Sequence, residues 1–204
     1  MANKCTTDVS LYDDVPFCQG SKSLPGVRDH FYFVPKRDCT LIPTPEGFTA
    51  KTLDQVAVIT KNIVLAADKM WMRVDLVPNE SEPSSEQQGS FGAFTFLNKI
   101  TLVMPGTEQK VTGLISCMNN DDVIILVPQR DGKCRLFGNA AFHVDIKPSQ
   151  AWGKAVTDAN TTTIEVSVTD EFATPFYEGD FETADGVMSG KTDELKAGAD
   201  SSEP

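Results

Sequence analysis

Histidine is the side chain that most often serves as a general base or a metal ligand, and the chain has two, His30 and His143. Neither has a His, Cys or carboxylate partner at the spacing that a zinc site on one element requires. His30 precedes Phe31 in an aromatic run, so we interpret it as a partly buried strand residue. The histidines therefore indicate neither a catalytic base nor a metal centre.

Neighbouring carboxylates can bind divalent cations or act together as acid and base. Such pairs include Asp13-Asp14, Asp121-Asp122 and Asp170-Glu171. None follows the alternating oxygen ligands of a calcium loop, and roles in turns and helix caps suit them better. Two carboxylates facing each other across a cleft, as glycoside hydrolysis needs, are not indicated either.

The sequence also lacks the motifs of common enzyme classes. It contains no G-x-S-x-G elbow, no P-loop and no dinucleotide-binding fingerprint. We therefore predict that the protein is not an enzyme. No catalytic, cofactor-binding or metal-binding residue is expected, and no cofactor.

The five cysteines are an odd set without any C-x-x-C spacing, which argues against a disulfide framework and a zinc knuckle. The N-terminus lacks the basic-then-apolar plan of a secretory signal, so we expect a reducing cytoplasm and free thiols. A pair between Cys5 and Cys18, or between Cys18 and Cys39, stays open as an alternative. The remaining cysteines are Cys117 and Cys134.

Two further features have both a functional and a structural interpretation. Trp71 and Trp152 could stack on sugars, but packing in a core or an interface is the more common role of tryptophan. Asn160-Thr161-Thr162 matches a glycosylation acceptor, yet without a secretory signal we interpret it as a turn that leads into a strand.

Composition limits the possible partners. A length of 204 residues suits one domain with irregular ends, and 29 acidic against 18 basic residues give a formal charge of -11. This charge opposes binding to nucleic acid and to anionic membranes. No apolar run approaches the ~20 residues that a membrane-spanning helix needs, so no membrane partner is expected.

One helix is predicted among strands. Val111, Leu114, Ile115 and Met118 recur at helical spacing, which predicts a helix over 107–119 with Thr107 as its N-cap. We expect its apolar side to cover the continuous apolar strand 123–127.

Alternation and apolar runs predict strands, bounded by Gly, Pro and Asn. In the strand 70–76, the buried face should consist of Met70, Met72, Val74 and Leu76. The strand 164–169 has the cleanest alternation, and its buried face should consist of Ile164, Val166 and Val168. Residues 56–59 and 63–66 suit two short strands or a short helix, and 90–104 suits two strands or one long bent strand. The other expected strands are 30–34, 134–137 and 141–146, the last ending at Pro148.

The irregular segments divide the chain into an arm, a domain and a tail. Residues 1–29 are rich in turn formers and should form an extended arm, and 30–180 should be the β domain. The polar stretch 79–89 should be a mobile loop. Residues 181–204 are acidic and poor in apolar side chains, so they should form a flexible, disordered tail. Truncation at Asp180 is then expected to leave the melting temperature nearly unchanged.

The stretches 123–139, 160–169 and 173–177 together resemble tail tube (major tail) proteins of tailed bacteriophages, of the type found in phages of gut Bacteroidetes. The resemblance is one of order: the predicted helix 107–119, an apolar strand, an Asp131-Gly132-Lys133 turn, a returning "RLFG" strand, a polar loop and a Thr-rich strand that finishes at Pro-Phe-Tyr. The resemblance covers residues 95–178 and carries no catalytic residues. It implies an antiparallel β-sandwich or barrel with a flanking helix.

The resemblance also implies a virion structural protein, made in the host bacterial cytoplasm, that self-assembles into hexameric rings. Such rings stack into a tail tube through which DNA passes as non-specific cargo, in contact with other virion structural proteins. Alternatives are a neck, connector or head-decoration protein, or a monomeric β-sandwich that binds a ligand such as a carbohydrate.

Overall fold

The structure is a computed structural model, and it describes residues 11–20, 23–155 and 157–196. Strands account for 42% of the chain and helices for 10%, with several antiparallel sheets and one helix. The predicted mainly β fold class, a sandwich-like arrangement of antiparallel sheets with a flanking helix, is therefore confirmed.

The larger sheet has six strands in the order β3-β12-β9-β8-β1-β5. Their bounds are β1 (His30–Pro35), β3 (Val58–Ile59), β5 (Met72–Asp75), β8 (Val123–Pro128), β9 (Cys134–Phe137) and β12 (Phe176–Tyr177). All neighbours pair antiparallel except β12 and β3, which pair parallel. Every residue of β8 is buried, as its unbroken apolar run predicted, because both faces of this inner strand are covered.

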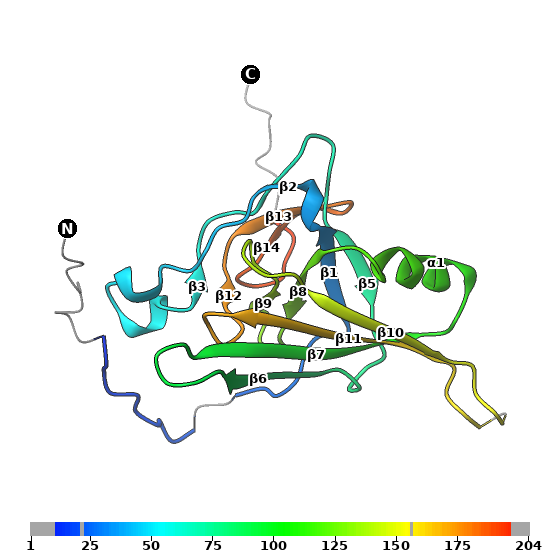
Figure 1. Cartoon of the computed structure of the whole chain (residues 1–204), viewed down its shortest axis with the longest axis horizontal. Coiled ribbons are helices and arrows are strands. Elements are labelled where there is room, and N and C mark those ends of the chain that lie inside the picture. The colour runs from blue at the N-terminus through cyan, green and yellow to red at the C-terminus, as the bar shows by residue number, and fades with distance from the viewer. Residues whose placement is uncertain (1–10, 21–22, 156, 197–204) are drawn as a thin grey trace.

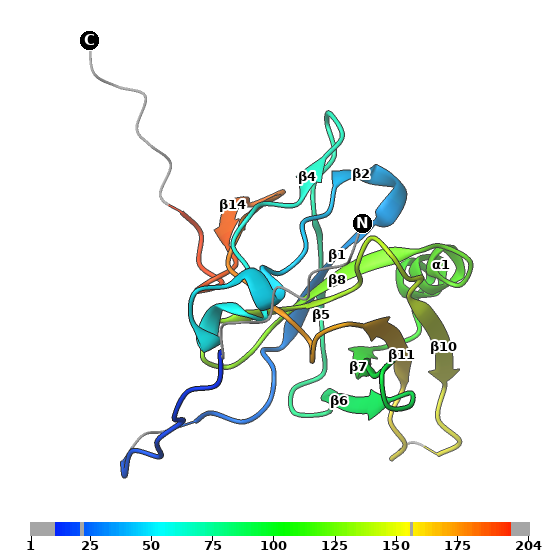
Figure 2. The ribbon, with the colours of Figure 1, turned by 60° about the vertical axis from the view of Figure 1, so that its left-hand side comes forward.

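The smaller sheet has four strands in the order β10-β11-β7-β6. Their bounds are β6 (Glu82–Gln88), β7 (Thr95–Pro105), β10 (Asp145–Ala151) and β11 (Thr161–Asp170). Ile164, Val166 and Val168 are at most 2% exposed, so the predicted buried face of β11 is confirmed. This sheet lies below the larger one in Figure 1 and is seen nearly end-on in Figure 2.

The main core lies between the two sheets and continues to α1 (Gln109–Met118), which covers one end of it (Figure 1). Ile115 and Met118 point into this core, as their helical spacing predicted. The helix begins two residues later than expected. Thr107 does not cap it, because its hydroxyl donates to Asn160 Oδ1 at 2.8 Å, and Glu108 occupies the N-cap position.

A second apolar cluster lies on the opposite face of the larger sheet. It includes Tyr177 of β12, and Trp71 and Phe181 pack on the strand residues; all three are at most 3% exposed. Two small two-stranded sheets surround it, β13 (Asp180–Thr183) with β14 (Gly186–Ser189) and β2 (Cys39–Leu41) with β4 (Val64–Leu65). Short 3-10 turns occupy Lys36–Asp38, Gly47–Thr49 and Leu53–Gln55.

The prediction of a flexible tail from residue 181 is wrong for residues 181–196. The hairpin β13-β14 contributes buried Phe181, and Leu195 then forms a β-bridge with Met188. The buried ring of Phe181 thus holds an otherwise acidic segment against the domain. The average composition of the segment does not reveal the effect of this single side chain. The domain therefore extends to Lys196, while residues 197–204 lie outside the described part.

The prediction of a mobile loop at 79–89 is also wrong. Residues 82–88 form β6, which pairs along β7 from Glu82–Thr101 to Gln88–Thr95. Side-chain bonds add to this ladder, including Lys99 to Glu86 at 2.9 Å. An edge strand forms its backbone hydrogen bonds with one neighbouring strand and can leave its side chains in solvent. The polar sequence of β6 therefore did not indicate a strand.

Two strand predictions change in detail, and two open alternatives are decided. The predicted Met face of β5 is partly wrong, since Met70 and Met72 are 44% and 41% exposed while Trp71 between them is buried. The predicted strand at 141–146 instead runs from Asp145 through Pro148 to Ala151, which an edge strand tolerates. Of the alternatives for 90–104, a single long strand forms. Of those for 56–66, two short strands form: β3 pairs with β12, and β4 (Val64–Leu65) pairs with β2 (Cys39–Leu41).

Candidate functional site

The most highly connected buried polar group is the carboxylate of Asp193, whose side chain is 1% exposed. It accepts hydrogen bonds from Arg28 Nη1 at 2.7 Å, His30 Nε2 at 3.0 Å and Tyr32 OH at 3.0 Å. The three donors come from β1 and the residues just before it. The C-terminal segment is thus fastened to the larger sheet by a fully satisfied buried carboxylate.

The electrostatics of this cluster suit a structural role. We call Asp193 with Arg28, His30 and Tyr32 the Asp193 clasp. Burial alone would raise the pKa of Asp193, but hydrogen bonding and charge from His30, with bonds from Arg28 and Tyr32, hold it below the ordinary range. Burial, with the nearby Asp193 carboxylate, raises the pKa of Tyr32, which therefore stays protonated as a donor. Both oxygens of the Asp193 carboxylate accept hydrogen bonds from protein donors, so we assign this carboxylate no catalytic role.

Asp193→Asn should lower the free energy of unfolding at pH 7 by about 2–4 kcal/mol, because the buried donors lose a charged acceptor. The folded pKa is depressed, so this stabilisation is full above the unfolded pKa of about 3.9 and is lost as pH falls through the folded pKa. Urea titrations of both proteins between pH 3 and 7 measure it; the two curves should converge on acidification. Glu194→Gln, an exposed neighbour, is the matched control, and equal losses in both variants would contradict the clasp.

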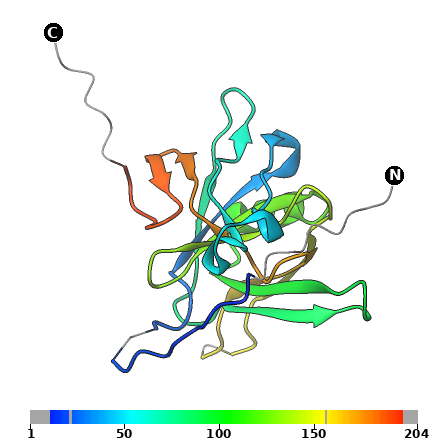
Figure 3. The same cartoon turned by 90° about the vertical axis from the view of Figure 1, so that its left-hand side faces the viewer.

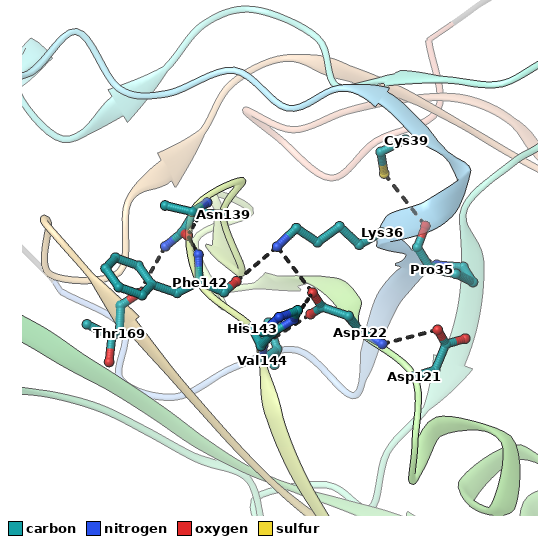
Figure 4. A network of polar contacts seen from close by, with 11 residues as sticks. Pro35, Lys36, Cys39, Asp121, Asp122, Asn139, Phe142, His143, Val144 and Thr169 are labelled. Carbon is teal, nitrogen blue, oxygen red and sulfur yellow. Dashed lines mark hydrogen bonds and ion pairs between the residues drawn. The ribbon is translucent and has the colours of Figure 1, made fainter.

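The second histidine lies in a polar turn that Figure 4 shows in detail. Asp122 accepts from Lys36 Nζ at 3.1 Å, His143 Nδ1 at 2.8 Å and Val144 N at 3.1 Å. Partial burial would raise the pKa of Asp122, but these hydrogen bonds outweigh it and lower the pKa. These bonds connect the turn before β10 to the start of β8. The His143 side chain is 93% exposed, so this group of residues does not enclose a reactive centre.

Two of the cysteines, Cys39 and Cys134, have thiols that burial makes less acidic. Cys39, Cys117 and Cys134 are free thiols, which removes the Cys18–Cys39 pair, while Cys5 lies outside the described residues. Burial raises the pKa of the Cys39 thiol to about 11 and that of Cys134 further still. Neither thiol forms an appreciable amount of the nucleophilic thiolate at neutral pH.

The other sequence candidates are scattered over the molecule. Trp71 lies in the second core with its ring edge-on to Phe181, whereas Trp152 is 78% exposed in the loop after β10. Asp170 is buried and its Oδ2 accepts from Asn139 at 2.8 Å, which is a turn role. Within the described ranges, no three His, Cys, Asp or Glu side chains converge on a possible metal position.

A concave, largely apolar groove of about 720 Å³ lies between α1 and β5. We call it the α1-β5 groove. Its walls are Met72 and Val74 from the strand and Val111, Leu114 and Cys117 from the helix. Its lining also includes charged side chains of both signs, and one wall is a sheet edge. These properties suit an extended polypeptide better than a metabolite.

Comparisons with protein-family models, curated proteins and solved structures find no match to this chain. Among the described residues, no helix has the length and apolar character needed to span a membrane. Sequence reasoning missed both the Asp193 clasp and the α1-β5 groove. Asp193 is 165 residues from Arg28 and has no local motif, so no sequence signal could have connected them.

Proposed function

We propose that this protein is a virion structural protein that self-assembles into rings, which stack into a phage tail tube. The observation that carries the proposal is the N-terminal arm. Tyr12, Val15 and Phe17 are 93%, 82% and 85% exposed on a segment without helix or strand. Exposed apolar side chains on an extended segment are stabilised when another surface covers them, and a neighbouring copy supplies that surface repeatedly.

The sheet edges and the charge support the same proposal. The larger sheet ends at β5 and β3 and the smaller at β10 and β6, so neither closes into a barrel by pairing its own end strands. A formal charge of -11 would give a ring a repulsive lining toward DNA, which favours passage over binding. Six-fold order, stacking and contact with other virion proteins come from the sequence resemblance.

The test is the oligomeric state of the full chain across concentration. Mass photometry should show a species six times the mass of the 22.2 kDa chain, and negative-stain images should show rings or short tubes. The charge gives a further expectation: assembled rings should not retain double-stranded DNA in a filter-binding assay at low salt. A monomer at every concentration up to milligrams per millilitre, without rings in images, would contradict the proposal.

A monomeric ligand-binding module is the second candidate, and the exposed Trp152 is the observation that favours it. In the segment after it, Asp158 Oδ2 accepts hydrogen bonds from Lys154 N and Ala155 N, both at 2.8 Å. An exposed indole can stack on a sugar ring. Quenching of tryptophan fluorescence by an oligosaccharide panel, absent in Trp152→Ala, would support this function in place of assembly.

A further inference from the structure

The outer edge of β5 is open for strand addition over Arg73 and Asp75. β5 pairs with β1 on one side, and Trp71 N, at its start, donates to Glu182 O on the other side at 2.8 Å. Backbone groups alternate in direction along a strand, so Arg73 and Asp75 direct theirs to the same side as Trp71. No described strand pairs with this side of β5 over Arg73 and Asp75. The open stretch is bounded by the Trp71–Thr183 bridge at one end and, at the other, by Val77 N, which donates to Val103 O of β7 at 2.7 Å. An extended segment could continue the sheet there.

The α1-β5 groove lies directly beside this open edge. A strand added to β5 would place alternate side chains against Met72, Leu114 and Val111, which are exposed or only partly buried. Such an occupant needs apolar side chains two residues apart and no helix or strand of its own to lose. Strand addition of this kind draws affinity from backbone bonds and specificity from the side-chain pockets.

The N-terminal arm meets those requirements. In an extended conformation Val15 and Phe17 lie on one side of the arm, two residues apart, and both are more than four-fifths exposed. Pro16 lies between them, and a proline on an added edge strand is tolerated when its position faces solvent. The arm also has the acidic pair Asp13-Asp14 just before this apolar pair.

Charge can set the register of this contact. The groove is lined by the cations Arg73 and Lys110 and by the carboxylates Asp75 and Asp185. Asp13 and Asp14 are attracted to the two cations and repelled by the two carboxylates, so the acidic end of the arm favours the Lys110 side of the groove. Because both signs are present, this effect selects a register more than it adds affinity.

The arm and the groove lie on opposite sides of the molecule. Figure 1 shows the arm, in dark blue, at the left and α1 with β5 at the right, and Figure 3, viewed from that left side, has the arm in front. A contact between the arm of one copy and the groove of another is therefore heterologous. Heterologous contacts build closed rings when the rotation between copies closes, and open filaments otherwise.

We infer that the α1-β5 groove receives residues 11–20 of a second copy of this chain, whose arm adds a strand to the open edge of β5. The inference rests on the proposed self-assembly and names the surfaces that would carry it. It makes each copy both a donor of one arm and an acceptor of another.

Two full-length variants separate the two halves of the contact. Phe17→Asp disables the arm but leaves the groove intact, and Met72→Asp disables the groove but leaves the arm intact. Each alone should raise the concentration needed for half-assembly at least about tenfold, as loss of a central apolar anchor does. Mixed together, they should form dimers but no rings, because only the arm of Met72→Asp and the groove of Phe17→Asp can engage. Phe48→Asp, 82% exposed outside both surfaces, is the matched control and should assemble normally.

The outcomes distinguish this inference from the proposed function. If the unaltered protein forms rings and Phe17→Asp assembles at the same concentration, the arm is not the connector, and the inference is wrong while self-assembly stands. An arm that occupied its own groove would give that same result. Failure of the unaltered protein to assemble contradicts the proposed function itself. Circular dichroism of Met72→Asp checks its fold, and Phe17→Asp, altered on an exposed arm, decides the question if Met72→Asp misfolds.

Discussion

Truncation after Asp180 is expected to abolish cooperative folding, the reverse of what the composition of the C-terminal segment predicts. It removes Phe181, whose ring centroid lies 4.9 Å from that of Tyr32, 5.8 Å from Trp71 and 6.4 Å from Tyr177. Loss of one buried aromatic side chain costs about 3–5 kcal/mol. Loss of the Asp193 acceptor, which leaves buried donors unpaired, adds a similar amount on the order of 3 kcal/mol.

Together these losses rival the whole stability of a domain, which is about 5–15 kcal/mol. Thermal melts followed by near-ultraviolet circular dichroism should therefore show no sharp transition for the truncated protein. Truncation after Lys196 is the control, because it leaves β13, β14 and Asp193 in place and should shift the midpoint by no more than about 2 °C. A normal melt of the protein truncated after Asp180 would mean that the hairpin contributes little to the fold.

Ile115→Asp should give the second large effect. Ile115 is 8% exposed and packs in the core between the sheets, so the substitution removes apolar burial and places a carboxylate there without a partner. The expected loss is on the order of 5 kcal/mol, enough to leave most of the protein unfolded at 37 °C. Solubility after expression and urea unfolding measure this result.

The same helix supplies the controls. Ser116→Asp introduces the same carboxylate one residue later on the exposed side and should cost less than about 1 kcal/mol. Glu108→Lys, at the exposed N-cap, should be similarly mild. Helical spacing places Leu114 on the same apolar side as Ile115, but Leu114 is only partly buried at the α1-β5 groove, so the cost of Leu114→Asp should be intermediate. Equal losses in Ile115→Asp and Ser116→Asp would contradict the helix orientation.

The sequence by itself determined the elements whose burial repeats with the backbone. Side chains alternate along a strand and return every third or fourth residue on a helix, so the patterns at Ile164–Val168 and Val111–Met118 define which face is buried. The apolar run of β8 requires cover on both faces for the same reason. These inferences use only local geometry, and they gave the fold class, the helix and the inner strand of the larger sheet.

Only the tertiary structure decided how segments far apart in the chain meet. β6 forms because β7 offers backbone partners, although its own residues are polar. Phe181 and Asp193 are buried because β1 and Trp71 enclose them, and a lone aromatic or acid in a polar segment has no period that reveals this. The open edge of β5 and the groove beside it follow from where α1 lies, since contacts between elements depend on positions in space and not on local propensity.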